Sequence, residues 1–268
     1  MPTPRLPTFF ISHGGGPWPF MKDLTQGAYK RLEASLQETA HQVGADLAAV
    51  LVISGHWMSE DFTVMTGPHP AMIYDYMGFP EHTYRIRYPA PGSPAVAARV
   101  QSLLEGAGLA VRTDAQRGFD HGTFVPLAVM YPQAQVPVLQ LSIKRSFDPA
   151  EHLAAGRALA PLRDENVLIL GSGLSYHNLR AFGPMARDAS QAFDRWLQAT
   201  LVGADPSART AGLIEWARAP AARQAHPHED HLLPLMMAVG AAEHEAGRCI
   251  YHEDDFMGGV SVSSFQFG

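Results

Sequence analysis

The sequence predicts an α/β fold in which a central, largely parallel or mixed sheet is flanked by helices. Short apolar runs alternate with amphipathic stretches up to about residue 170, the pattern of successive βαβ units. The 268 residues, 46% of them hydrophobic, are enough to bury a large core. Glycines and prolines are spread through the chain, and no linker divides it. We therefore expect one domain over residues 1–268.

The first half of the chain begins with an apolar run bounded by glycine and proline, which predicts a strand at Thr8–Ser12. Apolar residues then recur every three or four positions, which predicts a helix at Gln26–Val43. Further elements are expected at strand Ala48–Ser54, strand Phe62–Thr66, strand Tyr84–Tyr88, helix Pro94–Glu105 and strand Leu109–Arg112. Two loops interrupt them, the aromatic and proline-rich Gly67–Pro80 and the histidine-bearing Arg117–Phe124. Long loops in compact domains tend to be functional.

In the second half, the clearest signal is a helix start at Asp148, where a capping aspartate precedes a proline and then Glu151. This helix is expected to reach Leu162, between strands Val136–Ile143 and Asn166–Leu170. The remaining elements are expected as helices Val125–Met130, Met185–Leu201, Thr210–Arg218 and His231–His244, and strands Cys249–His252 and Val260–Phe267. The last strand can pair within the chain or across subunits, so a homo-oligomer stays open.

Composition excludes several classes of function. A net charge of −6 leaves no basic footprint, so nucleic acid is not an expected partner. No apolar run approaches the ~18 residues of a membrane span. The single cysteine, Cys249, excludes an internal disulfide and fits a reducing cytoplasm. The first ten residues lack the apolar core of a signal peptide, so we expect a cytoplasmic protein.

Three of the strand-like runs each lead into a histidine. His13 follows the first strand and precedes three glycines, His56 lies in the turn SGHW, and His177 follows GSG by four residues. Open α/β sheets hold ligands at the carboxyl ends of their strands, so three imidazoles from parallel neighbours would converge there. Neutral imidazole is a common ligand of zinc and also suits iron. We therefore predict a metal site at this edge.

A second histidine cluster lies in AHPHEDHLLPL, Ala225 to Leu235. His231 begins an apolar helix, so it should point into or beside the core and is expected as a ligand. His226 and His228 could support the ligands from behind. Asp230 and Glu229 could orient a ligand or act as one, and Asp230 could equally be a helix cap. The other histidines are expected at the surface or in supporting positions: His41, His69, His82, His152, His244 and His252.

Six motifs follow in order between residues 12 and 235: SHGGGP, SGHW, YDYMGFP, RGFDHGTFVPL, GSGLSYHNL and HPHEDHLLPL. Together they resemble the extradiol ring-cleavage dioxygenases of the LigB type, in the branch of the DOPA 4,5-dioxygenases. The resemblance implies one divalent metal per chain, iron(II) in active dioxygenases and zinc in some members. By motif it makes His13, His56 and His231 metal ligands. It makes His177 the catalytic base or a fourth ligand.

The resemblance also implies a substrate side. His121 lines it and can donate to a catechol oxygen or to bound oxygen. We assign Tyr74, Phe79 and His226 to substrate binding. For the loop aromatics Tyr74, Tyr76 and Phe79, plain loop packing is the alternative.

The leading hypothesis is a metal-dependent extradiol dioxygenase that opens a DOPA-like catechol with O2. The usual iron(II) oxygenase site has two histidines and a carboxylate, whereas a site of three or four histidines suits zinc well. Two alternatives therefore stay open, a zinc-dependent hydrolase and a non-catalytic metal- or ligand-binding protein on the same scaffold. The substrate, the cleavage position and the choice between Fe²⁺ and Zn²⁺ are not determined by the sequence.

Overall fold

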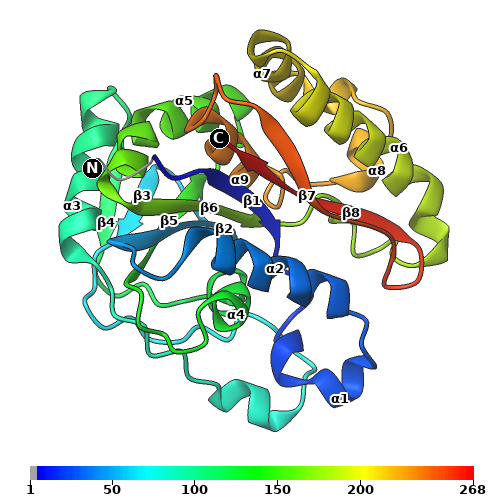
Figure 1. Ribbon diagram of the computed structural model, residues 1–268, viewed down its shortest axis with the longest axis horizontal. Coiled ribbons are helices and arrows are strands. Elements are labelled where there is room, and N and C mark those ends of the chain that lie inside the picture. Colours follow the sequence, from blue (N-terminus) through cyan, green and yellow to red (C-terminus); the bar gives the residue numbers. More distant parts are fainter. Residues whose placement is uncertain (1–4) are drawn as a thin grey trace.

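An eight-stranded sheet organises the computed structural model, which describes residues 5–268 (Figure 1). The strands are β1 Thr8–Ser12, β2 Ala49–Ser59, β3 Phe62–Met65, β4 Val111–Asp114, β5 Val138–Lys144, β6 Val167–Gly173, β7 Gly247–Phe256 and β8 Val260–Phe267. Their order across the sheet is β4-β3-β5-β2-β6-β1-β8-β7. The four central strands are parallel, while β3 pairs antiparallel with β5 and the β7–β8 hairpin adds antiparallel to β1. The expected α/β fold with a mixed, mostly parallel sheet is confirmed.

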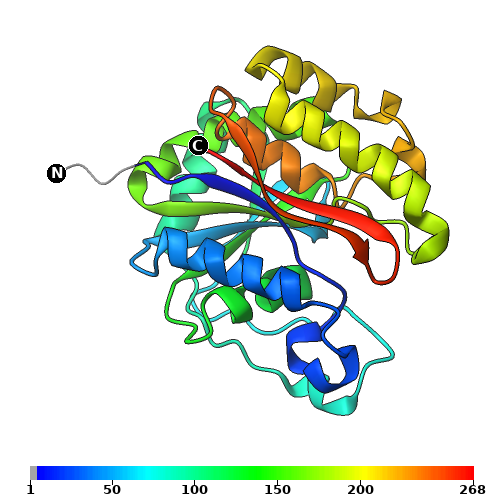
Figure 2. The same cartoon turned by 45° about the vertical axis from the view of Figure 1, so that its right-hand side comes forward.

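Helices cover both faces of this sheet. They are α1 Lys22–Thr25, α2 Lys30–Val43, α3 Pro94–Gly106, α4 His121–Met130, α5 Pro149–Leu159, α6 Arg187–Gln198, α7 Pro206–Ile214, α8 Ala222–Ala225 and α9 Leu233–Gly240. α2 and α4 pack on one side, α9 lies on β1 and β6 from the other side, and α5 packs against α9 (Figure 2). α6 lies beside the β7–β8 hairpin. Within residues 5–268, no helix combines the length and apolar composition that crossing a membrane requires.

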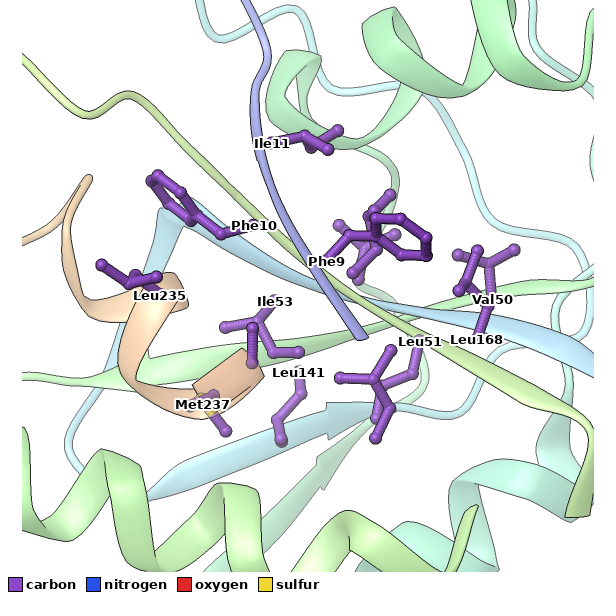
Figure 3. Close-up of a cluster of buried hydrophobic side chains, with 14 of the residues drawn as sticks. Phe9, Phe10, Ile11, Val50, Leu51, Ile53, Leu141, Leu168, Leu235 and Met237 are labelled. Atoms are coloured by element: carbon purple, nitrogen blue, oxygen red, sulfur yellow. The ribbon is translucent and has the colours of Figure 1, made fainter. Parts of the chain in front are cut away.

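The core is built from the inward-facing side chains of the central strands. Figure 3 shows Phe9, Leu51 and Leu168 of three neighbouring strands together with Leu235 and Met237 of α9. All five are fully buried. Strands covered on both faces read as nearly continuous apolar runs, which is why these strands were recognisable in the sequence.

The predicted helix start at Asp148 is confirmed, because its Oδ1 accepts a hydrogen bond from Ala150 N at 2.8 Å. The predicted start of α2 at Gln26 is wrong. Gln26 and Gly27 have positive φ angles, so the helix begins only at Lys30. α7, in contrast, starts earlier than the predicted Thr210. Its cap is Asp205, whose carboxylate accepts hydrogen bonds from Ser207 N and Ala208 N.

The strand predicted at Tyr84–Tyr88 is absent from the described chain. Glu81–Arg85 forms a 3-10 turn instead, and the following residues are irregular. The hydroxyl groups of Tyr76 and Tyr74 donate to the carbonyls of Thr83 and Ile86, both at 2.6 Å. These carbonyls are therefore satisfied by side chains and not by a neighbouring strand.

Three further expectations near the motifs are corrected. SGHW is not a turn, because β2 continues to Ser59, although its pairing with β6 ends at Ser54. His121 is the first residue of α4 and not part of a loop. The long helix expected at His231–His244 is shorter, Leu233–Gly240, so His231 lies in the turn before it.

Two other expectations concern His152 and the last strand. His152 is fully buried in α5, where its Nδ1 donates to Asp148 O and its Nε2 accepts from Lys144 N, so a surface position for it is wrong. β8 pairs with β1 and β7 within the chain.

Candidate active site

Three neighbouring strands bring the predicted histidines together. β2, β6 and β1 are adjacent and parallel, so their carboxyl ends meet at one edge of the sheet. His13 follows β1 directly, and His177 follows β6 by four residues. His56 lies on the part of β2 beyond Ser54, where the strand has separated from β6. The expected convergence of the strand ends is therefore present.

His231 reaches the same place because the chain before α9 runs against β6. Leu174 N donates a hydrogen bond to His231 O at 3.2 Å. A Cβ atom at Gly173 would collide with this carbonyl oxygen, so only glycine allows the close approach. Gly173 at the end of β6 thus helps to position His231, which lies far along the chain.

The Nε2 atom of His56 lies close to the Nε2 atoms of two other histidines. His56 Nε2 lies 3.2 Å from His13 Nε2 and 3.1 Å from His231 Nε2. Each ring nitrogen has a single in-plane direction for a proton or a lone pair, so His56 Nε2 cannot satisfy both neighbours by hydrogen bonding. A shared cation would satisfy all three at once.

The groups beside the Nδ1 atoms indicate how these rings are protonated. His13 Nδ1 lies 2.7 Å from Gly14 O, a carbonyl that can only accept, so this nitrogen carries the proton. His56 Nδ1 lies 3.3 Å from Asp75 Oδ2. Both arrangements leave a lone pair on Nε2. His231 Nδ1 lies 3.2 Å from Asp230 Oδ2 but has no partner in hydrogen-bonding geometry among the described residues.

Burial keeps this cluster neutral. Desolvation, with the nearby His121 and His177, lowers the pKa of His13 to about 3. Burial and neighbouring imidazoles also hold the pKa values of His56 and His231 well below the usual range. The three rings are therefore neutral at neutral pH, each with one ring nitrogen free of a proton, as metal ligands must be.

His121 is held at the edge of the cluster by two aspartates. Asp120 caps α4 by accepting from Thr123 N at 3.1 Å, which fixes His121 as the first helical residue. Asp75 accepts from His121 Nδ1 at 2.8 Å and from His121 N at 3.0 Å. Burial raises the pKa of Asp75, but the hydrogen bonds that it accepts from His121 outweigh burial and hold that pKa below its usual value. Asp75 thus bridges His121 and His56 as a carboxylate.

His177 stacks on His231. The ring centroids are 3.4 Å apart and the planes differ by 13°. His177 Nδ1 lies 3.9 Å from Asp230 Oδ1. Desolvation lowers the pKa of His177, opposed by Asp230, so this ring is also neutral at neutral pH. Two groups of side chains each bring one possible ligand atom per residue within 4.8 Å of the others. The first group is His13, His56 and His121, and the second is His177, Asp230 and His231.

The histidines line a cavity of about 850 Å³. Phe79 and Tyr76 of the aromatic loop line it, and Tyr76 packs edge-on against His121 with centroids 5.8 Å apart. Tyr74 and His226 are not among its lining residues. Tyr74 donates to Ile86 O, and His226 is fully buried with its Nε2 3.0 Å from Ser175 O.

Comparison with known proteins identifies the family. Residues 7–263 match the family model described as "Catalytic LigB subunit of aromatic ring-opening dioxygenase". The chain belongs to this family.

Relatives of the LigB protein span nearly its whole length. It is 39% identical to the 4,5-DOPA dioxygenase extradiol of Beta vulgaris over 97% of this chain and 96% of the relative. It is 36% identical to dioxygenase tasH of Hapsidospora irregularis over 98% and 85%. A crystal structure of an uncharacterized protein from Escherichia coli K12 superposes with a TM-score of 0.79 at 31% identity, covering 98% and 100%.

Family membership makes this LigB protein an aromatic ring-opening dioxygenase, an oxidoreductase, and implies an aromatic substrate, O2 and a divalent metal. It therefore favours the dioxygenase over the hydrolase and the non-catalytic alternatives.

Sequence reasoning missed Asp75 as a site residue, although it lies in the motif YDYMGFP. An aspartate between two tyrosines gave no sign of which histidines it would meet. Asp230 is not the cap of α9, whose N-terminal flanking residue is Leu232. Its Oδ1 instead accepts from His231 N at 2.9 Å, so it shapes the turn that carries the histidine.

Proposed function

We propose that this protein cleaves the ring of a catechol next to its two hydroxyl groups, with O2, at a divalent metal held by His13, His56 and His231. The observation that supports this most is that His56 Nε2 lies within 3.2 Å of the Nε2 atoms of His13 and His231, and that these neutral rings line a cavity with aromatic side chains. A catechol offers two adjacent oxygens that can replace water at a metal with open positions.

The spacing of the nitrogens fits a metal. Metal–nitrogen distances near 2.0–2.1 Å place ligand nitrogens about 2.8–3.4 Å apart for angles between octahedral and tetrahedral. The separations of 3.2 Å and 3.1 Å fall in this range. Iron(II) and zinc both accept imidazole, but zinc has no redox chemistry, so we propose iron(II) for the active enzyme.

For His177 we propose the role of base and not of ligand. Lone pairs of ring nitrogens lie in the ring plane. Because the rings of His177 and His231 are nearly parallel and 3.4 Å apart, a cation in the plane of one lies well out of the plane of the other. A neutral His177 can instead accept the proton that a catechol releases on binding.

For His121 we propose a contact with the substrate. Its Nδ1 is occupied by Asp75, which leaves Nε2 to contact a catechol oxygen. Phe79 and Tyr76 would bound the ring. The hydroxyl of Tyr76 is held by Thr83 O, so this residue presents its ring more than its hydroxyl. Tyr74 and His226 are proposed to support the site without contacting substrate.

The metal, when bound, would hold catechol and O2 together and let electrons pass from the ring to oxygen. The bond between a hydroxyl-bearing carbon and its outer neighbour breaks, and both oxygen atoms enter the product. The names of the relatives suggest DOPA as a candidate substrate.

The test combines metal content with oxygen uptake. Protein purified without chelators would be analysed for iron and zinc, loaded with iron(II) under argon and then mixed with catechols in an oxygen electrode. We expect oxygen consumption with a yellow ring-opened product. His13→Ala should lose both metal and activity. His177→Asn should keep the metal but lose about 10²–10⁴-fold in kcat.

His41→Asn, at an exposed position on α2, is the control and should behave like the unchanged protein. One tightly bound zinc per chain with no oxygen uptake on any catechol after iron loading would overturn the proposal.

A further inference from the structure

The cavity has a buried polar end and an exposed apolar end. His13 and His231 at the polar end are each 2% exposed. The apolar end includes Leu24, Leu179 and Met257, which are 64%, 74% and 45% exposed. These are three of the seven large apolar side chains that the described residues leave exposed. Exposed apolar side chains gathered at one cavity mark a surface that binds apolar groups.

The cavity is also larger than a catechol ring requires. Its volume of about 850 Å³ lies near the top of the range for small-molecule pockets. A catechol held with its diol at the histidines would direct its opposite end toward the mouth. A substituent on that end would therefore contact the apolar rim.

No lysine or arginine is found among the described residues that line this cavity. Its charged side chains are two carboxylates, Asp75 and Asp230, both engaged with histidines. Lys22, next to the lining residue Met21, forms an ion pair with Glu33 at 2.5 Å. A metal ion would be occupied by the diol. A carboxylate on the substrate would therefore meet an apolar rim and no lysine or arginine among the residues that line the cavity.

We infer that the preferred substrate is a catechol carrying an uncharged, apolar substituent opposite the diol, and not an amino acid or carboxylic acid such as DOPA. The inference rests on the proposed function and narrows its substrate class. Its physical basis is that an acid would bind with its carboxylate unpaired, and this disfavours the acid by more than the apolar rim favours a hydrocarbon substituent.

The experiment compares catechols of equal chain length in the iron-loaded enzyme. These are 4-propylcatechol, 3-(3,4-dihydroxyphenyl)propionate and L-DOPA. We expect kcat/KM for 4-propylcatechol to exceed that for either acid by at least about tenfold. Equal or better use of L-DOPA or of the propionate would overturn the inference and leave the dioxygenase proposal standing.

If none of the three is consumed, the proposed dioxygenase reaction is wrong. Calorimetric binding of the same compounds to the zinc-loaded protein would then decide the substituent preference separately. Tighter binding of 4-propylcatechol supports the inference, and equal or tighter binding of the acids contradicts it.

A charge placed at the rim tests where the substituent lies. Leu179→Lys should raise the kcat/KM of the propionate relative to 4-propylcatechol by about tenfold. Met185→Lys is the matched control, because Met185 is 77% exposed but does not line the cavity. It should leave the ratio unchanged. An unchanged ratio in Leu179→Lys, or an equal shift in both variants, would overturn the placement at this rim.

Discussion

Replacing Asp75 with asparagine should weaken metal binding without removing any ligand. The carboxylate accepts two hydrogen bonds from His121 through Oδ1, and its Oδ2 lies 3.3 Å from His56 Nδ1. Asparagine can keep only one oxygen. That oxygen should stay with His121, where it accepts twice, so the new NH2 group would face His56 Nδ1–H.

Two donors cannot face each other, so His56 should move its proton from Nδ1 to Nε2. Nε2 is the atom that meets His13 and His231, and a protonated nitrogen cannot bind a metal. Loss of such a supporting carboxylate typically costs 10–100-fold in metal affinity, or about 1.4–2.8 kcal/mol. We therefore expect the Kd for iron(II) or zinc to rise by about this factor.

Competition with a chromophoric chelator at pH 7 would measure the change. Asp61→Asn removes the same charge from a surface ion pair with Arg112 and is the matched control. It should bind metal as the unchanged protein does. Full affinity in Asp75→Asn, or an equal loss in Asp61→Asn, would refute the tautomer mechanism.

Three further predictions test the packing, the buried histidines and the metal. Gly173→Ala should destabilise the protein by about 1–3 kcal/mol in urea unfolding and weaken metal binding, because the added Cβ displaces the His231 backbone. Gly106→Ala is the control and should change neither, because a Cβ added at Gly106 meets no atom within 4 Å. Burial lowers the pKa of His152 to about 4, so its neutral form stabilises the fold above pH 6.5, and about 3 kcal/mol should be lost as the pH falls from 6.5 to 4. Urea unfolding of His152→Leu should show a smaller loss between pH 7 and 4.5, and an unchanged pH slope would contradict the assignment. Chelation should lower the melting temperature in calorimetry, and either zinc or iron(II) should restore it, whereas iron(II) alone should restore oxygen uptake.

The strands that carry the site were predictable because their chemistry is local. An apolar run that leads directly into glycine and histidine describes both β1 at Thr8–Ser12 and β2, and a run that leads into glycine describes β6. One failure has its cause in side chains outside the segment itself. Tyr84–Tyr88 has strand-like residues, yet hydroxyls from Tyr74 and Tyr76 satisfy two carbonyls in this region.

The sequence alone determined which residues could form a metal site, because histidines after buried strands can be recognised one motif at a time. Only the tertiary structure decided how they act together. The order β2-β6-β1 and the turn before α9 bring the Nε2 atoms of His13 and His231 within 3.2 Å of His56 Nε2, and Asp75 contacts both His121 and His56. The ring of His177 is stacked on that of His231, so its nitrogens lie in a different plane from those of His231. These relations depend on distances and ring planes between residues far apart in the chain, from 43 positions for His13 and His56 to 175 for His56 and His231, and such contacts leave no signal in the local pattern of the chain.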